Sequence, residues 1–304
     1  MKIESSDNLG VQVSELPIQK VSADDAKKLV SLVHEHKMVI LKDQEFDETE
    51  YVAFSRVLGV PQVYPQANYH HPQWPEIFVS TNIPGPNGEK WGVKGTGRYW
   101  HTDCAFLPDP LPFTMVTPRV IPKSSRGTLY IDMQSVYDAL PKRLRAFVDT
   151  HNAIHEGKWR YKVQPSDTDR AIIDILDELE KIAPPVPHPA VIVHPVTKKR
   201  ILYISSGFTT GFEGVSYEEG KRWLAELVEF VEREEHVHQK TWRGGEILLW
   251  DNRVLIHKAA HGDPNEPNRS YRIGVYDGLP FYVNATHPSR AGTPEERHAV
   301  HAGN

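Results

Sequence analysis

Four stretches of the chain repeat apolar residues at helical spacing behind a polar starting residue. In the first, Ser22 and Asp25 form a capping-box pattern, and apolar side chains follow every three or four residues. In the second, Asp47 precedes the apolar residues and Gly59 follows them, which is typical of the two ends of a helix. The pattern predicts helices over residues 23–36, 47–59, 166–182 and 216–234.

Short apolar runs between these helices are typical of β-strands. They cover residues 38–41, 77–80, 113–117, 128–132, 190–193, 201–204, 246–250 and 271–275. Strands and helices do not alternate as in a doubly wound sheet, so we predict an α+β fold that is mainly β, with a jelly-roll core and flanking helices. Because no linker divides the chain, residues 1–285 are expected to form a single domain before a polar tail over residues 286–304.

Charge and composition argue against several classes of function. Lys and Arg number 35 and Asp and Glu number 40, which gives a net charge of −5 and no basic stripe for nucleic acid. No stretch is long and apolar enough to span a membrane, and the first residues lack the pattern of a signal peptide. The single cysteine, Cys104, forms no internal disulfide, so we expect a cytoplasmic protein.

Three residues offer ligands for a metal ion. His101 and Asp103 lie two residues apart in a segment predicted to be extended, and alternate residues of a strand point to the same face. His257 follows an apolar strand and can supply the third ligand. Two histidines and one carboxylate leave metal positions open for a co-substrate, which suits Fe(II) and dioxygen. A buried His–Asp hydrogen bond without a metal is the alternative interpretation.

A co-substrate such as 2-oxoglutarate adds a second requirement, because its distal carboxylate needs a cation. Arg272, on the strand that follows His257, is the first candidate for this cation, and Arg269 is the second. The hydroxyl of Thr128 can add a hydrogen bond. For each arginine, a surface ion pair on a strand is the alternative interpretation.

The sequence from about Leu9 to Tyr282 resembles the taurine dioxygenase and 2,4-D dioxygenase group of Fe(II)/2-oxoglutarate oxygenases. The motifs that carry the resemblance are Leu9-Gly-Val-Gln-Val, the strand Val39–Gln44, the helix end Leu58-Gly59, His101-Thr-Asp103 and Trp250-Asp-Asn-Arg253. The resemblance implies a double-stranded β-helix fold of the jelly-roll or cupin-like kind.

The same resemblance implies the ligands of the cofactors. Fe(II) would be held by His101, Asp103 and His257, and 2-oxoglutarate by Thr128 and Arg272. Many members of the group place two arginines four residues apart on the last strand, whereas Arg269 and Arg272 are three apart here. The role of Arg269 is therefore open.

A narrower set of motifs resembles the isonitrile-forming subgroup, which oxidises an N-carboxymethyl-3-amino fatty acid. These motifs are Tyr64, Tyr69-His70-His71, Pro75–Phe78, Arg126-Gly-Thr128, Lys162 before Pro165–Asp167, and His261-Gly262. The resemblance implies substrate contacts for Tyr64, Tyr69 and Lys162. It places Arg126 near the co-substrate or substrate and His261 on a mobile loop, with His70 as a further candidate. Pro65 and Gln164 depart from the subgroup, which bears on the chain length or polar end of the substrate.

Together these observations predict an Fe(II)/2-oxoglutarate-dependent oxygenase. The leading expectation is that it converts a (3R)-3-[(carboxymethyl)amino] fatty acid into an isonitrile, using two O2 and two 2-oxoglutarate. One alternative is a hydroxylase of a small amino acid or sulfonate, and another is a non-catalytic β-barrel binding protein. The expected partners are a small carboxylate substrate and O2, without nucleic acid or membrane. A homo-oligomer is one of the assemblies that the sequence leaves open.

Overall fold

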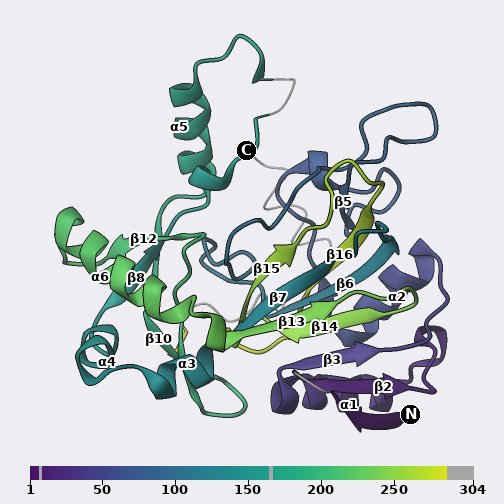
Figure 1. Ribbon diagram of the computed structural model, residues 1–304, viewed down its shortest axis with the longest axis horizontal. Coiled ribbons are helices and arrows are strands. Elements are labelled where there is room, and N and C mark those ends of the chain that lie inside the picture. The colour runs from purple at the N-terminus through teal and green to yellow at the C-terminus, as the bar shows by residue number, and fades with distance from the viewer. Residues whose placement is uncertain (7–8, 164–166, 286–304) are drawn as a thin grey trace.

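A computed structural model describes residues 1–6, 9–163 and 167–285, and its largest element is an eight-stranded sheet (Figure 1). The strand order is β1-β2-β3-β14-β6-β16-β4, and β5 also pairs with β16. The bounds are β1 (Lys2–Ser5), β2 (Val11–Ser14), β3 (Met38–Leu41), β4 (Val60–Pro61), β5 (Phe78–Thr81), β6 (Phe113–Val120), β14 (Ile247–Asp251) and β16 (Arg269–Tyr276). The polar tail predicted for residues 286–304 lies outside the described residues.

A second, smaller sheet contributes the other wall of the molecule's main pocket. It has the order β13-β7-β15, with all pairs antiparallel. Its strands are β7 (Gly127–Asp132), β13 (Val237–Thr241) and β15 (Leu255–Ala260). Residues of this sheet and of the eight-stranded sheet line one cavity, and the sheets with the helices around them agree with the predicted α+β class.

Strand β14 shows how the sequence divides the core between two faces of the large sheet. Ile247 and Leu249 pack in one hydrophobic cluster with the N-terminal helices, whereas Leu248 and Trp250 pack in the other. Successive side chains of a strand point to opposite faces, so an uninterrupted apolar run is required where both faces are buried.

Two helices cover the outer face of the eight-stranded sheet (Figure 1). Helix α1 (Ala23–His36) has the predicted bounds, and α2 (Glu48–Leu58) is one residue shorter at each end than predicted. The Ser22 hydroxyl accepts a hydrogen bond from the Asp25 N–H, while the Asp25 carboxylate accepts one from the Ser22 N–H. Asp47 and Glu50 repeat this capping box at α2. Such a cap stabilises a helix by about 1 kcal/mol.

The chain between β7 and β13 forms a separate layer of helices and short strands beside the pocket. It contains α3 (Met133–Ala139), α4 (Lys142–Val148), β8 (Asn152–His155), η3 (Lys158–Arg160), α5 (Ile172–Ile182), β9 (Val186–Pro189), β10 (Val191–Val193), β11 (Arg200–Leu202), β12 (Thr209–Phe212), α6 (Tyr217–Val231) and η5 (Glu234–His236). Strands β12, β8 and β9 form one small sheet, and β10 and β11 form a hairpin. Helix α5 stands away from the rest of this layer (Figure 1).

Two predicted helix ends in this layer need correction. The helix expected from residue 166 begins at Ile172, because Asp167 to Arg170 form a turn closed by a hydrogen bond of 3.1 Å between the Arg170 N–H and the Asp167 carbonyl. The helix expected to reach residue 234 ends at Val231. Two further short helices of the described chain are η1 (Ile18–Lys20) and η2 (Ala67–Tyr69). In the described residues, no helix has the length and apolar character needed to cross a bilayer.

Candidate active site

His101 and His257 face each other across an isolated β-bridge. The His101 N–H donates to the His257 carbonyl at 3.0 Å, and the His257 N–H donates to the His101 carbonyl at 2.8 Å. His257 lies on β15, but the strand expected through His101 and Asp103 is wrong, because the chain turns at residues 103–106. Cys104 takes a left-handed conformation in this turn, with φ of 57°. The turn, rather than strand periodicity, brings the Asp103 carboxylate to the two imidazoles.

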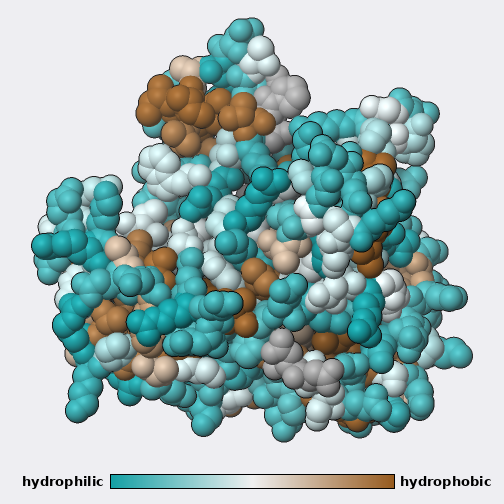
Figure 2. Space-filling model, in the orientation of Figure 1, coloured by the Kyte–Doolittle hydropathy of each residue, from teal (hydrophilic) through white to brown (hydrophobic). Residues whose placement is uncertain are grey.

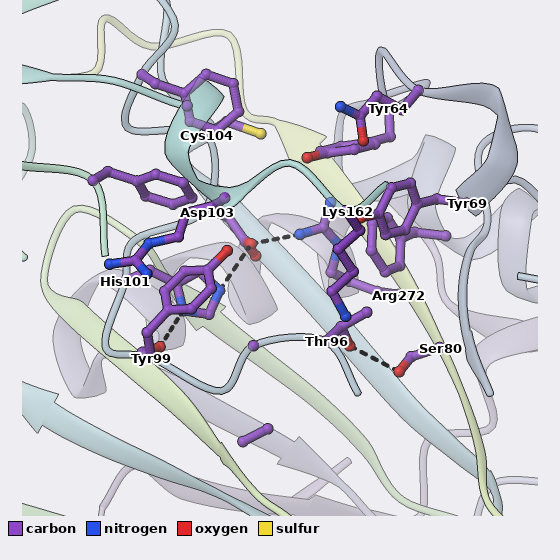
Figure 3. A pocket seen from close by; sticks show the side chains of 18 of the residues that line it. Tyr64, Tyr69, Ser80, Thr96, Tyr99, His101, Asp103, Cys104, Lys162 and Arg272 are labelled. Atoms are coloured by element: carbon purple, nitrogen blue, oxygen red, sulfur yellow. Dashed lines mark hydrogen bonds and ion pairs between the residues drawn. The ribbon is translucent and has the colours of Figure 1, made fainter. Parts of the chain in front are cut away.

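The ligand atoms of His101, Asp103 and His257 lie within 4.8 Å of one another. Figure 3 shows His101 and Asp103 beside each other in the pocket. Asp103 Oδ1 is 3.7 Å from His101 Nε2, and Asp103 Oδ2 is 3.9 Å from His257 Nε2. These distances are too long for direct hydrogen bonds. The Nδ1–H of His101 donates to the Tyr99 carbonyl at 2.8 Å, which leaves a lone pair on Nε2. The arrangement therefore suits three donors that share one ion.

The protonation states of these three residues also suit a metal ion. Burial lowers the pKa of His101, and burial together with His101 lowers that of His257 to about 3. Burial raises the pKa of Asp103, but Arg272 and the two histidines outweigh it and bring the pKa to about 2. At neutral pH the imidazoles are neutral and the carboxylate is charged, which is the donor set that a divalent cation requires.

A chain of hydrogen bonds fixes the Asp103 carboxylate. The Thr114 hydroxyl donates to Asp103 Oδ2 at 2.6 Å, and the Asn252 amide donates to the Thr114 hydroxyl at 2.8 Å. Trp250 Nε1 donates to Asn252 Oδ1 at 2.8 Å. Arg272 Nη1 forms an ion pair with Asp103 Oδ1. Sequence analysis identified the Trp250-Asp-Asn-Arg motif but missed Thr114, which carries no pattern of its own.

Arg126 and Thr128 lie two residues apart and line the same pocket. Arg126 is 4% exposed and donates to Asn268 Oδ1 at 2.7 Å and to the Ser80 hydroxyl at 3.3 Å, so its hydrogen-bond partners in the described chain are neutral. Burial lowers its pKa to about 10. Its guanidinium lies 4.8 Å over the ring of Trp242, whose Nε1 donates to the Thr128 hydroxyl at 3.1 Å. A buried cation with neutral partners is well suited to bind a carboxylate.

The two arginines of β16 point to opposite faces of the strand. Arg272 lies in the pocket, with its guanidinium 4.3 Å from the centre of the Phe78 ring. Arg269, an odd number of residues away, lies 4.3 Å over the ring of Trp91, and it is not among the residues that line the pocket. Because strand side chains alternate, a spacing of three cannot bring both arginines to one face. The second candidate cation of the sequence analysis is therefore not brought to the site.

Three of the predicted substrate residues line the pocket: Tyr64, Tyr69 and Lys162. The Tyr64 and Tyr69 rings are 5.2 Å apart, and the Arg272 guanidinium lies 5.4 Å from the Tyr64 ring. Lys162 reaches toward the Thr96 side of the pocket (Figure 3), and its Nζ donates to the carbonyls of residues 94 and 95. Burial, with a contribution from a nearby arginine, lowers the pKa of Lys162 to about 8.

The other two predicted substrate residues do not line the pocket. A ring nitrogen of His261 lies 3.0 Å from the Thr96 carbonyl, and one of His70 lies 2.6 Å from the Tyr64 carbonyl. Each histidine therefore contacts the backbone of a pocket residue instead of the cavity.

The cavity has a volume of about 280 Å³. Its wall includes several residues that sequence analysis did not select: Ser80, Thr96, Phe208, Trp242, Leu179 and Ile182. They come from distant elements and form no local motif, so only the tertiary structure identifies them.

Several known proteins are similar to this chain in sequence or in fold. The sequence profile of the taurine catabolism dioxygenase TauD, TfdA family matches residues 3–273. The chain is 23% identical to the alpha-ketoglutarate-dependent 2,4-dichlorophenoxyacetate dioxygenase of Cupriavidus pinatubonensis, over 81% of this chain and 86% of that protein. It is 26% identical to the (S)-phenoxypropionate/alpha-ketoglutarate-dioxygenase of Sphingobium herbicidovorans, over 75% and 78%.

Two solved structures share the fold. The structure of AAD-2 in complex with Mn(II) and N-oxalylglycine matches with a TM-score of 0.76 and 22% identity, covering 92% of this chain and all of that one. A taurine dioxygenase from Burkholderia xenovorans matches with a TM-score of 0.71 and 23% identity, covering 92% of each chain. With the profile match over nearly the whole length, the chain belongs to the TauD, TfdA family of dioxygenases, which confirms the enzyme class predicted from its motifs.

Proposed function

We propose that His101, Asp103 and His257 hold Fe(II) and that Arg126 and Thr128 bind the distal carboxylate of 2-oxoglutarate. In the register of β7 and β15, Thr128 lies opposite Ala259, two residues along the strand from His257. Two residues of a strand span about 6.8 Å. A five-carbon dicarboxylate that chelates the metal with one end has a length suited to reach Thr128 and Arg126 with the other.

In this proposal Arg272 serves the substrate. It lies beside Asp103 and Tyr64 and therefore close to the metal, whereas the distal carboxylate of a chelating 2-oxoglutarate is remote from it. Tyr64, Tyr69 and Lys162 complete a second set of carboxylate-binding groups. The observation that carries the proposal is that one pocket holds two such sets, one with Arg126 and one with Arg272.

The substrate that fits best carries an N-carboxymethyl-3-amino acid head. It has two carboxylates, which suit the cations Arg272 and Lys162 and the phenols of Tyr64 and Tyr69. One relative is named for 2,4-dichlorophenoxyacetate, which also carries a carboxymethyl group on a heteroatom. The cations fix the carboxymethyl C–H bonds beside the metal, and positioning selects the bond that reacts.

The proposed reaction balances over two turnovers. R–NH–CH2–COOH, two O2 and two 2-oxoglutarate give R–N≡C, three CO2, two succinate and two H2O. Bound iron would activate O2, the oxidant, and each O2 accepts two electrons from 2-oxoglutarate and two from the substrate. We assign the two sheets around the pocket to the two halves of a double-stranded β-helix, which holds both carboxylate sets at one metal.

A hydroxylase of a small amino acid or sulfonate is the second candidate. The same cations can bind a sulfonate, and several relatives are named for sulfonate or sulfate ester substrates. This candidate predicts insertion of one oxygen atom and one succinate for each product.

The test is aerobic incubation with Fe(II), 2-oxoglutarate and either N-carboxymethyl-3-aminobutanoate or taurine, with products identified by mass spectrometry. We expect an isonitrile from the first compound. His101→Ala should abolish it, whereas His36→Ala, at the end of α1 and not among the pocket-lining residues, should retain it. Hydroxylated product without isonitrile would favour the second candidate, and absence of succinate with every substrate would contradict both.

A further inference from the structure

Helix α5 carries an apolar stripe that the fold leaves largely unburied. Ile172, Ile175, Leu179 and Ile182 recur at helical spacing, yet Ile175 is the one buried residue of the helix. Ile182 is 75% exposed, and Ile172 is 56% exposed. Figure 2 shows hydrophobic surface gathered over the part of the molecule where α5 stands. A stripe of this kind normally packs against a partner.

One end of the stripe belongs to the active-site pocket. Leu179, Ile182 and Ala183 line the same cavity as the metal ligands, Arg272 and Lys162. The other end of the stripe, at Ile172, does not line the cavity, and neither does the adjacent Ile173. The cavity is therefore polar where it meets the metal and apolar where it meets α5.

An ion pair fixes this end of α5 beside the polar part of the site. Lys158, on η3, pairs with Glu180 of α5 and with Glu156. Lys162 follows η3 by two residues and holds its cation toward the pocket. The short segment of residues 158–162 therefore contacts α5 through Lys158 and carries Lys162, the proposed carboxylate-binding cation.

We propose that the pocket end of α5 binds the hydrocarbon tail of the substrate, so that Leu179 and Ile182 favour long chains. This inference rests on the proposed function, whose substrate head lies at Arg272 and Lys162. A molecule with an anionic head and a saturated tail matches both ends of the cavity. Burying each methylene against α5 should tighten binding about fourfold, until the tail passes Ile182.

The test measures binding separately from chemistry. Protein loaded with Mn(II) and 2-oxoglutarate without oxygen is titrated calorimetrically with N-carboxymethyl-3-amino acids from butanoate to dodecanoate. A parallel series uses unsubstituted saturated carboxylates of the same lengths. The double variant Leu179→Ser/Ile182→Ser removes the pocket end of the stripe. Its matched control, Ile172→Ser/Ile173→Ser, makes the same chemical change on the same helix outside the cavity.

We expect affinity to rise with chain length in the wild type and the control, and the rise to be lost in the pocket variant. The proposal is overturned if affinity rises equally with chain length in all three proteins. It is also overturned if affinity does not rise with chain length for either the N-carboxymethyl-3-amino acids or the unsubstituted carboxylates. A pocket variant that changes only the oligomeric state in sedimentation also overturns it, because α5 would then contact a second copy of the chain. If no homologue yields isonitrile with oxygen but the length dependence behaves as expected, the proposed function fails and the tail site stands.

Discussion

Replacing Arg126 by glutamine tests the assignment of the 2-oxoglutarate site. Arg126 is almost fully buried, and its hydrogen bonds in the described chain go to the neutral groups of Asn268 and Ser80. Solvent therefore screens its attraction for a carboxylate only weakly. Removing one partner of a buried, hydrogen-bonded charge pair costs about 2–5 kcal/mol, which raises the dissociation constant for 2-oxoglutarate about 30-fold or more.

The variant also affects folding, so stability needs its own measurement. Asn268 Oδ1 loses a donor, at a cost of about 1–3 kcal/mol where it stays buried and unpaired, whereas the Ser80 hydroxyl keeps its 2.8 Å hydrogen bond with the Thr96 hydroxyl. A urea titration shows whether the variant is folded at the assay temperature. Arg269→Gln is the matched control, because Arg269 has the same charge but lies over Trp91 outside the pocket.

The assay is calorimetric titration of the Mn(II)-loaded protein with 2-oxoglutarate in the absence of oxygen. Arg269→Gln should bind like the wild type. Arg272→Gln should bind 2-oxoglutarate with nearly unchanged affinity and lose affinity for the substrate. A folded Arg126→Gln protein that binds 2-oxoglutarate like the wild type, together with loss of binding in Arg272→Gln, would refute the reasoning and return the co-substrate to Arg272.

Three further predictions concern the metal, the substrate and the fold. Thr114→Val removes the 2.6 Å hydrogen bond to Asp103 and should weaken Co(II) binding about 10–100-fold, as measured by absorption titration. Thr114→Ser keeps the hydroxyl and should restore the affinity. Equal Co(II) affinities of Thr114→Val and the wild type would contradict a positioning role for Thr114. Lys162, with its pKa lowered to about 8, is cationic below that pH and neutral above it, so kcat/KM should fall as the pH rises through 8. Lys162→Arg stays cationic and should shift this decline to higher pH. An unchanged pH profile would contradict a role for the Lys162 cation in substrate binding. Asp251 is a buried carboxylate that contacts His34, His194 and Arg253. Asp251→Asn should therefore lower the free energy of unfolding, measured by urea titration, by about 3–5 kcal/mol. A loss of less than about 1 kcal/mol would contradict this prediction.

Capping patterns and apolar periodicity predicted those helices and strands whose burial in the fold follows the local sequence pattern. The capping box at Ser22 and Asp25 located α1, and apolar runs located the central strands. Helix α3 was missed because Asp132 ends β7 and caps the helix at once, without a polar linker to mark the change. The turn at Cys104 was missed because nothing in the sequence favours a left-handed cysteine.

The candidate site also combines residues that local sequence patterns predict with residues that only the tertiary structure identifies. Motifs selected the three residues of the candidate metal site, which the fold brings together from distant segments. The different positions of Arg269 and Arg272 follow from strand periodicity and could have been predicted from their odd spacing. The contacts of Thr114 with Asp103, and of α5 with the pocket, depend on tertiary packing and leave no local pattern.

We propose that the candidate metal site oxidises a carboxymethylamine to an isonitrile in two turnovers. The most direct test is the molar ratio of succinate to isonitrile formed from N-carboxymethyl-3-amino acids, with succinate from substrate-free controls subtracted. We expect two succinate molecules for each isonitrile. One succinate for each hydroxylated product, with no isonitrile, would contradict it.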